Sequence, residues 1–378
     1  MKRLWKIIPP CFSDVIGFEA VLNGTEGLGI IDDPSRYKPI RQGNADQNGG
    51  GGRRGGHRDD NSLAMEAGNT GNRLWERGQE PRGHRGGHGR RVSRDTRVVN
   101  SDIRNADIIT GTEKKVLAAF EENRSMDPTF VLLCHAPSSS MIGSDLEANA
   151  AQIREVSSIP AAYVNIDGGK DYLYGIGMTL ETMGKLLLDK REKIPGGVNL
   201  LGCNMIDWTE EQRSAAEDWL RKQGFELLSC WGMKESTERL KTAAAAQINL
   251  VVSVAGLHLA RYMETEFNIP YTVGAPFGEA SCETLLAKLR GEACEGQKGG
   301  EEEPTALIVG EQLTANAIRE ALRRRGWHGI QVASLYDMDK GLMEPGDGKL
   351  TAEEDLEKRL EAVEKAQEKA DIILEDYR

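Results

Sequence analysis

Residues 129–156 read TFVLLCHAPSSSMIGSDLEANAAQIREV. The apolar run at 130–133 predicts a buried strand that ends at Cys134. A small, polar turn is expected next, and apolar residues over 146–153 then recur at helical spacing. A strand, a turn and a helix in this order predict an open α/β sheet. Its carboxyl edge, where ligands of such sheets bind, would carry the Cys134 thiol.

The same plan repeats along the chain. Further strands are predicted in GVNLLGCNMI, FELLSCW, INLVVSV, PYTVG, ALIVG and GIQVAS. Helical segments separate them, among them one over 178–188 and TEEQRSAAEDWLRKQG, which begins with a capping-box pattern. Such alternation predicts parallel sheets covered by helices on both faces. We expect three Rossmann-like α/β domains, over residues 1–195, 196–295 and 303–378, the last of which need not be complete.

Residues 41–95 have a different composition. They are rich in Gly, Arg and His and carry almost no apolar periodicity. This composition favours a disordered insert or a stretch of DNA translated in a shifted frame. An RNA-binding role is disfavoured because no aromatic residues are interleaved with the arginines. A metal site at His57, His84 and His88 is also disfavoured.

The net charge and the lengths of the apolar runs exclude several classes of protein. A net charge of −11 argues against a nucleic-acid binder. No apolar run approaches the roughly 18 residues of a membrane-spanning helix. The first residues lack the apolar core of a secretory signal peptide because Pro9 and Pro10 interrupt it. We therefore expect a cytoplasmic protein without a membrane or nucleic-acid partner.

Six cysteines are widely spaced and include no CxxC pair. In a reducing cytosol, each is either a small buried residue or a ligand. Cys11 lies in a proline-stiffened loop just before a predicted helix, where the helix dipole favours a thiolate. Cys203 and Cys230 lie in packing runs and are interpreted as core, whereas Cys282 and Cys294 have no partner motif.

Other candidate groups are weaker. His135 adjoins Cys134 and could donate protons, although a histidine beside a turn can equally be a simple hydrogen-bonded residue. Residues 310–312, Gly-Glu-Gln after a strand, resemble a phosphate-binding turn, but no GxGxxG follows a predicted strand. The nearest pattern, at 175–177, opens no strand-to-helix turn. Neither NAD nor a P-loop for ATP is expected.

Several segments in series resemble one known family. They are PPCFSD, SDIRNADIITGTEKKVLAAF, LLCHAPSSSMIGSDLEA, GVNLLGCNMID, INLVVSVAGLHLARYMETEFNIPYTVGAPFG and LIVGEQLTANAIREALR. In this order they resemble the catalytic-component (component 1) family of nitrogenases and nitrogenase-like reductases, over nearly the whole chain outside 41–95. The resemblance implies three Rossmann-like domains and a two-fold dimer. It also implies an iron–sulfur cluster at the subunit interface, and electrons from an ATP-dependent iron–sulfur reductase.

The cluster ligands follow from the same resemblance. The family places interface-cluster cysteines where this chain has Cys11 and Cys134. A 4Fe-4S cluster takes four protein ligands, so two subunits related by a two-fold axis would supply two thiolates each. The chain has no cysteine in the loop after GLGIIDD, where the family usually has one, and Asp14 or Asp33 could replace that thiolate.

A second departure concerns Ser253, which stands where true nitrogenases bind their large metal cofactor through a cysteine. A hydroxyl is a poor ligand for such a soft cofactor, so dinitrogen reduction is not expected. The sequence thus predicts an oxidoreductase subunit, in a homodimer or paired with a homologous subunit, that reduces an unidentified small molecule. The alternative is a non-catalytic scaffold for the assembly of a metal cofactor.

Overall fold

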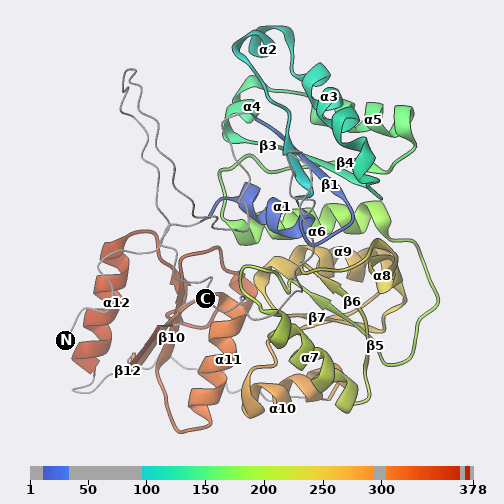
Figure 1. Ribbon diagram of the computed structural model, residues 1–378. Coiled ribbons are helices and arrows are strands. Elements are labelled where there is room, and N and C mark those ends of the chain that lie inside the picture. Colours follow the sequence, from blue (N-terminus) through green and yellow to red (C-terminus); the bar gives the residue numbers. More distant parts are fainter. Residues whose placement is uncertain (1–11, 34–95, 293–303, 367–370, 375–378) are drawn as a thin grey trace, which may run out of the picture. The chain divides into compact units, whose positions relative to one another are not determined.

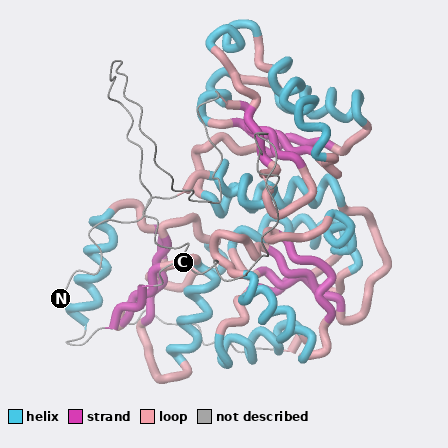
Figure 2. Tube along the Cα trace, viewed as in Figure 1, coloured by secondary structure: helices cyan, strands magenta, loops and turns pink. Residues whose placement is uncertain are grey.

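The computed structural model describes residues 12–33, 96–292, 304–366 and 371–374 (Figure 1). These residues form three four-stranded sheets, whose strands are magenta in Figure 2. All pairs of neighbouring strands in these sheets are parallel. All three sheets belong to one compact unit. Predictions made for residues 41–95 lie outside the described residues.

The first sheet has the order β2-β1-β3-β4. Its strands are β1 (Leu28–Asp32), β2 (Val98–Asn100), β3 (Val131–His135) and β4 (Ala161–Val164). On one face lie α3 (Glu113–Asn123) and α5 (Leu146–Ser157), and on the other lie α1 (Asp14–Leu22) and α6 (Tyr172–Leu187). Successive residues of a strand point to opposite faces. Leu133 accordingly packs with the first pair of helices and Cys134 with the second.

The second sheet has the order β6-β5-β7-β8. Its strands are β5 (Gly197–Leu201), β6 (Glu226–Trp231), β7 (Ile248–Val251) and β8 (Tyr271–Val273). Helices α7 (Glu210–Lys222) and α10 (Gly278–Leu289) pack on one face, and α8 (Thr237–Lys241) and α9 (Leu257–Phe267) on the other. The predicted capping box of α7 is present, with Thr209 and Gln212 exchanging hydrogen bonds.

The third sheet has the order β11-β10-β9-β12. Its strands are β9 (Ala306–Val309), β10 (Ile330–Ser334), β11 (Gly348–Lys349) and β12 (Asp371–Leu374). Helix α11 (Gln312–Arg323) packs on one face and α12 (Glu353–Ala366) on the other. The remaining elements are α2 (Asn105–Thr110), α4 (Pro137–Ile142), η1 (Arg124–Met126), η2 (Thr242–Ala245), η3 (Val254–Gly256) and η4 (Lys340–Leu342).

The predicted fold class, parallel α/β sheets flanked by helices, is confirmed, whereas the proposed domain boundaries stay a prediction. Two local predictions were wrong. The polar turn expected after Cys134 is helix α4, which Pro137 opens in the position that favours proline. Helix α6 begins at Tyr172 rather than Met178, because Asp171 caps it by accepting the Tyr174 N–H at 3.1 Å.

Among the described residues, no helix combines the length and apolar character that a membrane crossing demands.

Helices α1 and α6 approach each other closely through glycines. A Cβ at Gly17 would lie 2.7 Å from the backbone nitrogen of Ile176, and one at Gly175 would meet the backbone carbonyl of Asp14. Helix α6 also packs against α9, so the α1–α6 contact lies in the core shared by the first and second sheets.

We expect Gly175→Ala to destabilise the protein by about 2 kcal/mol or more, because the added methyl group forces two backbones apart. Gly184→Ala on the same helix is the matched control. Its Cβ would contact the flexible end of Leu259, and alanine raises helix propensity by up to about 1 kcal/mol. Urea unfolding of both variants checks this. Equal free energies of unfolding would contradict it.

Candidate functional site

The carboxyl edge of the first sheet brings polar groups together. In the parallel pair of β1 and β3, Ile31 is opposite Cys134 and Asp32 is opposite His135. Asp33 follows directly after β1. The predicted position of Cys134, at the carboxyl end of a strand, is therefore confirmed.

The Cys134 thiol is completely buried, with an exposed fraction of 0 %. It lies in the hydrophobic core that α1 and α6 form with the sheet. Burial raises the pKa of this thiol well above its ordinary value, and the charges of Glu19, Asp14, Asp32 and Asp33 raise it further. The thiol is therefore protonated at neutral pH, in surroundings opposite to the cationic ones that favour thiolates.

Hydroxyl groups hold the two carboxylates after β1. Ser101 Oγ donates to Asp32 Oδ1 at 2.7 Å, and Thr112 Oγ1 donates to Asp32 Oδ2 at 3.1 Å. Ser138 Oγ donates to Asp33 Oδ1 at 2.7 Å. Burial raises the pKa of Asp33, and the Ser138 bond partly opposes that shift. These bonds connect the loops after β1, β2 and β3 into one polar layer.

His135 is almost fully buried beside this layer, with 8 % exposed. Its Nδ1 lies 3.2 Å from Ser139 Oγ, and its ring meets the Tyr163 ring edge-to-face at 5.3 Å between centroids. Burial lowers the pKa of His135 below its ordinary value, so the ring is neutral at neutral pH. A role in proton transfer stays a prediction.

Asp14 opens α1, just after the predicted ligand Cys11, which lies outside the described residues. Its carboxylate accepts the Lys170 N–H at 3.3 Å through Oδ2, whereas Oδ1 has no hydrogen-bond partner among the described residues. The side chain is fully buried, and burial raises its pKa. A buried carboxylate with an unpaired oxygen can accept a proton or a cation.

The described residues do not supply the ligand set of an iron–sulfur cluster by themselves. Within them, no group of three or more His, Cys, Asp or Glu side chains is arranged to hold a metal ion. A cluster takes four ligands, so the others would have to come from Cys11, other parts of the chain outside the described residues, or a partner subunit. Cluster binding by Cys11 and Cys134 therefore stays a prediction.

Ser253, which the resemblance places at the position of the cofactor cysteine of true nitrogenases, is 1 % exposed. Its hydroxyl donates to the backbone carbonyl of Gly202 at 2.7 Å. A Cβ at Gly202, whose φ is +83°, would lie 2.6 Å from that hydroxyl oxygen. The hydroxyl is therefore engaged with the backbone and closely packed.

Sequence reasoning missed the role of Glu311. This carboxylate caps α11 by accepting the Thr314 N–H at 2.9 Å, and its other oxygen accepts the Val254 N–H at 2.9 Å. It thus connects the third sheet to the loop after β7. The carboxyl group of Glu311 already occupies the helix N-terminus, so the resemblance of residues 310–312 to a phosphate-binding turn was misleading. Burial raises the pKa of Glu311 from 4.5 to about 7.

A second acid, the partly buried Asp207, lies near Glu311 and raises its pKa further. Tyr172 donates its hydroxyl to Asp207 Oδ1 at 2.6 Å, and Asn204 donates its amide to Oδ2 at 2.8 Å. Burial raises the pKa of Asp207, and these two bonds oppose the shift. Tyr172 belongs to α6, Asp207 follows β5 and Glu311 precedes α11, so these residues come from different sheet regions. No local sequence pattern could therefore have shown that Asp207 and Glu311 are close.

The other cysteines and histidines are placed as follows. Cys203 and Cys230 are fully buried in the core of the second sheet, as predicted, and Cys203 Sγ lies 3.3 Å from Met233 Sδ. Cys282 is half-buried. His258 is partly exposed and lies 3.4 Å from a carboxylate oxygen of Glu181. Cys294, His57, His84 and His88 lie outside the described residues.

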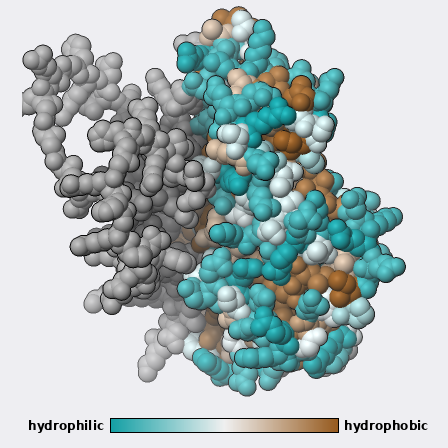
Figure 3. All heavy atoms as spheres, turned by 45° about the vertical axis from the view of Figure 1, so that its right-hand side comes forward, coloured by the Kyte–Doolittle hydropathy of each residue, from teal (hydrophilic) through white to brown (hydrophobic). Residues whose placement is uncertain are grey.

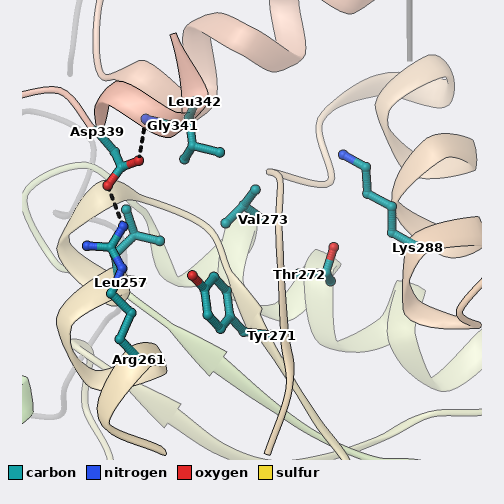
Figure 4. A pocket seen from close by; sticks show the side chains of 9 residues that line it. All are labelled: Leu257, Arg261, Tyr271, Thr272, Val273, Lys288, Asp339, Gly341 and Leu342. Atoms are coloured by element: carbon teal, nitrogen blue, oxygen red, sulfur yellow. Dashed lines mark hydrogen bonds and ion pairs between the residues drawn. The ribbon is translucent and has the colours of Figure 1, made fainter. Parts of the chain in front are cut away.

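A cavity of about 370 Å³ opens beside β8 (Figure 4). It is lined by Leu257, Arg261, Tyr271, Thr272, Val273, Lys288, Asp339, Gly341 and Leu342. These residues come from α9, β8, α10 and the turn that includes η4. The sequence contains no local motif for this cavity, because its walls meet only in the folded chain.

Comparisons with known proteins agree on one family. Residues 81–334 match the family model of nitrogenase component 1 type oxidoreductases. The nitrogenase iron-molybdenum cofactor biosynthesis protein NifE of Clostridium pasteurianum is 27 % identical over 202 residues, which are 50 % of this chain. The match spans only 42 % of the length of that relative.

Solved structures of nitrogenase Cp1 share the fold. The structure at pH 6.5 has a TM-score of 0.59 and 12 % identity, over 100 % of this chain and 79 % of that chain. The structure at pH 5 has a TM-score of 0.59 and 17 % identity, over 96 % and 72 % of the two chains. At this identity the likeness shows the fold alone.

The raised pKa of Glu311 predicts a pH dependence of stability. The folded state holds the proton up to about pH 7 and the unfolded chain only up to about 4.5. The free energy of unfolding should therefore fall as pH rises between these values, by about 3.5 kcal/mol at roughly 1.4 kcal/mol per pKa unit, and level off above them.

Glu311→Gln removes this titration, so the free energy of unfolding of the variant should depend less on pH in this range. Urea unfolding of both proteins over this pH range measures the difference between their free energies of unfolding. That difference should change with pH in the window between the two pKa values. A constant difference would show that Glu311 does not titrate there.

Proposed function

Because this chain belongs to the nitrogenase component 1 type oxidoreductase family, we propose that it is an assembly subunit that holds an iron–sulfur cluster or metal-cofactor precursor as cargo and passes it on. It does so in a dimer with a second copy or a homologous subunit. The NifE protein that it resembles is named for cofactor biosynthesis, which supports this role.

The state of Cys134 carries the proposal. A metal must displace the proton of a cysteine before the thiolate can bind it. Burial and four nearby carboxylates hold the Cys134 proton firmly, so metal binding there is weaker than at an exposed, low-pKa thiol. A weakly held cluster suits a carrier that releases its cargo, whereas an electron-transfer enzyme needs a cluster that stays bound.

Exposed apolar residues near the carboxyl edge of the first sheet support the dimer. Ile109 on α2 is 88 % exposed and Met141 on α4 is 90 % exposed. The loops that follow these helices are joined by a hydrogen bond of 2.8 Å between Thr112 Oγ1 and Ser144 Oγ, so both residues lie in one region. On the face of the molecule that Figure 3 presents, hydrophobic residues are scattered among hydrophilic ones.

A second candidate function is a reductase that receives low-potential electrons from an ATP-dependent partner and reduces a small molecule. The family is described as one of oxidoreductases, which favours it. The two candidates differ in what happens to the reduced cluster. A reductase oxidises it when substrate is added and keeps its iron, whereas a scaffold transfers the iron to an acceptor protein.

Anaerobic reconstitution with iron and sulfide tests the cargo role. We expect Cys134→Ala to lose most of the bound iron and Cys203→Ala to keep it. The second variant is a matched control because both thiols are fully buried near the carboxyl end of a parallel strand. Iron uptake by the unchanged protein should rise with pH, since thiolate formation limits it.

The acceptor experiment then separates the two functions. The reconstituted protein is incubated with an apo form of a family member, and iron is measured in both proteins after separation. Transfer supports the assembly role. Retention of all iron, with the cluster oxidised on addition of a small-molecule substrate, would refute it in favour of the reductase.

Charged substitutions test the proposed dimer face. We expect Ile109→Lys or Met141→Lys to weaken dimerisation by about tenfold or more, since a buried unpaired charge is costly. Val156→Lys is the control, because Val156 is also exposed, at 56 %, but lies on α5. Light scattering over a dilution series gives the dissociation constants. An unchanged dimer in both test variants would rule out this face.

A further inference from the structure

The cavity beside β8 has two distinct ends. Arg261 on α9 and Lys288 on α10 stand on opposite sides of it, with Val273 and Leu342 between them (Figure 4). Strand β8 is the edge strand of its sheet, so the cavity lies where the sheet ends. Its volume of about 370 Å³ falls within the range of small-molecule sites.

One end of the cavity is electrically balanced. Arg261 Nη2 donates to Asp339 Oδ2 at 2.5 Å, and the Gly341 N–H donates to Asp339 Oδ1 at 3.0 Å. Both carboxylate oxygens are therefore engaged. The positive and negative charges at this end cancel, so Asp339 does not repel a negatively charged ligand strongly.

The other end carries the positive charge of Lys288, which pairs with no carboxylate of the described residues. Among the described residues, the side chain of Lys288 makes no ion pair or hydrogen bond, and Thr272 offers a hydroxyl on the adjoining strand. A lysine in the last turn of a helix is often simply solvated. Here, however, its ammonium group borders a cavity whose wall also includes the apolar side chains of Leu257, Val273 and Leu342.

We propose that this cavity binds a small organic anion. A carboxylate or phosphate group meets Lys288 and Thr272, and the apolar body of the molecule packs between Val273 and Leu342. Small-molecule sites combine apolar walls with a few polar groups in this way. The cavity shares no residue with the carboxyl edge of the first sheet, so the inference is independent of the proposed cluster-carrying role.

Isothermal titration calorimetry of the full chain tests it, with benzoate, phenyl phosphate and neutral benzamide as probes. At least one of the two anions should bind with a dissociation constant of about 1 mM or below, and which one binds identifies the head group. Benzamide should bind at least about tenfold more weakly, because it cannot form a charge-assisted bond to Lys288. Added salt should weaken binding of the anion.

Lys288→Met keeps the length of the side chain and removes its charge, and it should weaken anion binding about tenfold or more. Lys222→Met is the matched control, because Lys222 is also an exposed lysine in the last turn of a helix of the second sheet. It should leave binding unchanged. The proposal is overturned if neither anion binds near 1 mM, if benzamide binds equally well, or if both variants bind alike.

Discussion

The close approach of α1 and α6 is the contact on which the rest of the structure depends. Gly17 and Gly175 let two helix backbones meet where any side chain would separate them. Helix α6 then covers one face of the first sheet and contacts α9 of the second. Asp171, which caps α6, also accepts the Asp337 N–H at 2.7 Å, so the helix is bonded to the third sheet region as well. Helix α6 and its capping residue therefore connect segments that belong to all three sheet regions.

Buried carboxylates lie near helix α6 because parallel strands place their carboxyl ends, and the loops that follow, at a common edge. These loops leave backbone N–H groups in need of acceptors. Asp14, Asp171 and Glu311 each accept such N–H groups. Their hydrogen bonds offset only part of the free energy of desolvation, so the pKa values of Asp14 and Glu311 rise. The connection that Glu311 makes between the second and third sheet regions is thus sensitive to protonation.

The acidic surroundings of Cys134 set the chemistry open to it. A thiol close to Asp14, Asp32 and Asp33 keeps its proton, whereas resident metal ligands are thiolates. The same position on the same fold can thus hold a cluster tightly or loosely, depending on the neighbouring charges. This physical difference connects the shared fold with the cargo-carrying role that we propose.

Several features were set by the sequence alone, because they depend on local patterns. The apolar run 130–133 and the helical spacing over 146–153 predicted β3, α5 and the parallel sheet. The amino-acid sequences of several segments, taken in order, indicated the family. The polar turn after Cys134 and the start of α6 were misjudged, because Pro137 and Asp171 act as helix-start signals only when the surrounding backbone is in place.

Only the tertiary structure decided the burial, the hydrogen-bond partners and the nearby charges of the site residues. It buried Cys134 among acids, engaged the Ser253 hydroxyl, and brought Glu311 to the Val254 N–H across 57 residues of chain. It also built the cavity between Arg261 and Lys288. Burial and charge proximity arise from segments far apart in the chain. The sequence therefore specifies which side chains are present. Packing determines their protonation states, their hydrogen-bond partners and the cavities beside them.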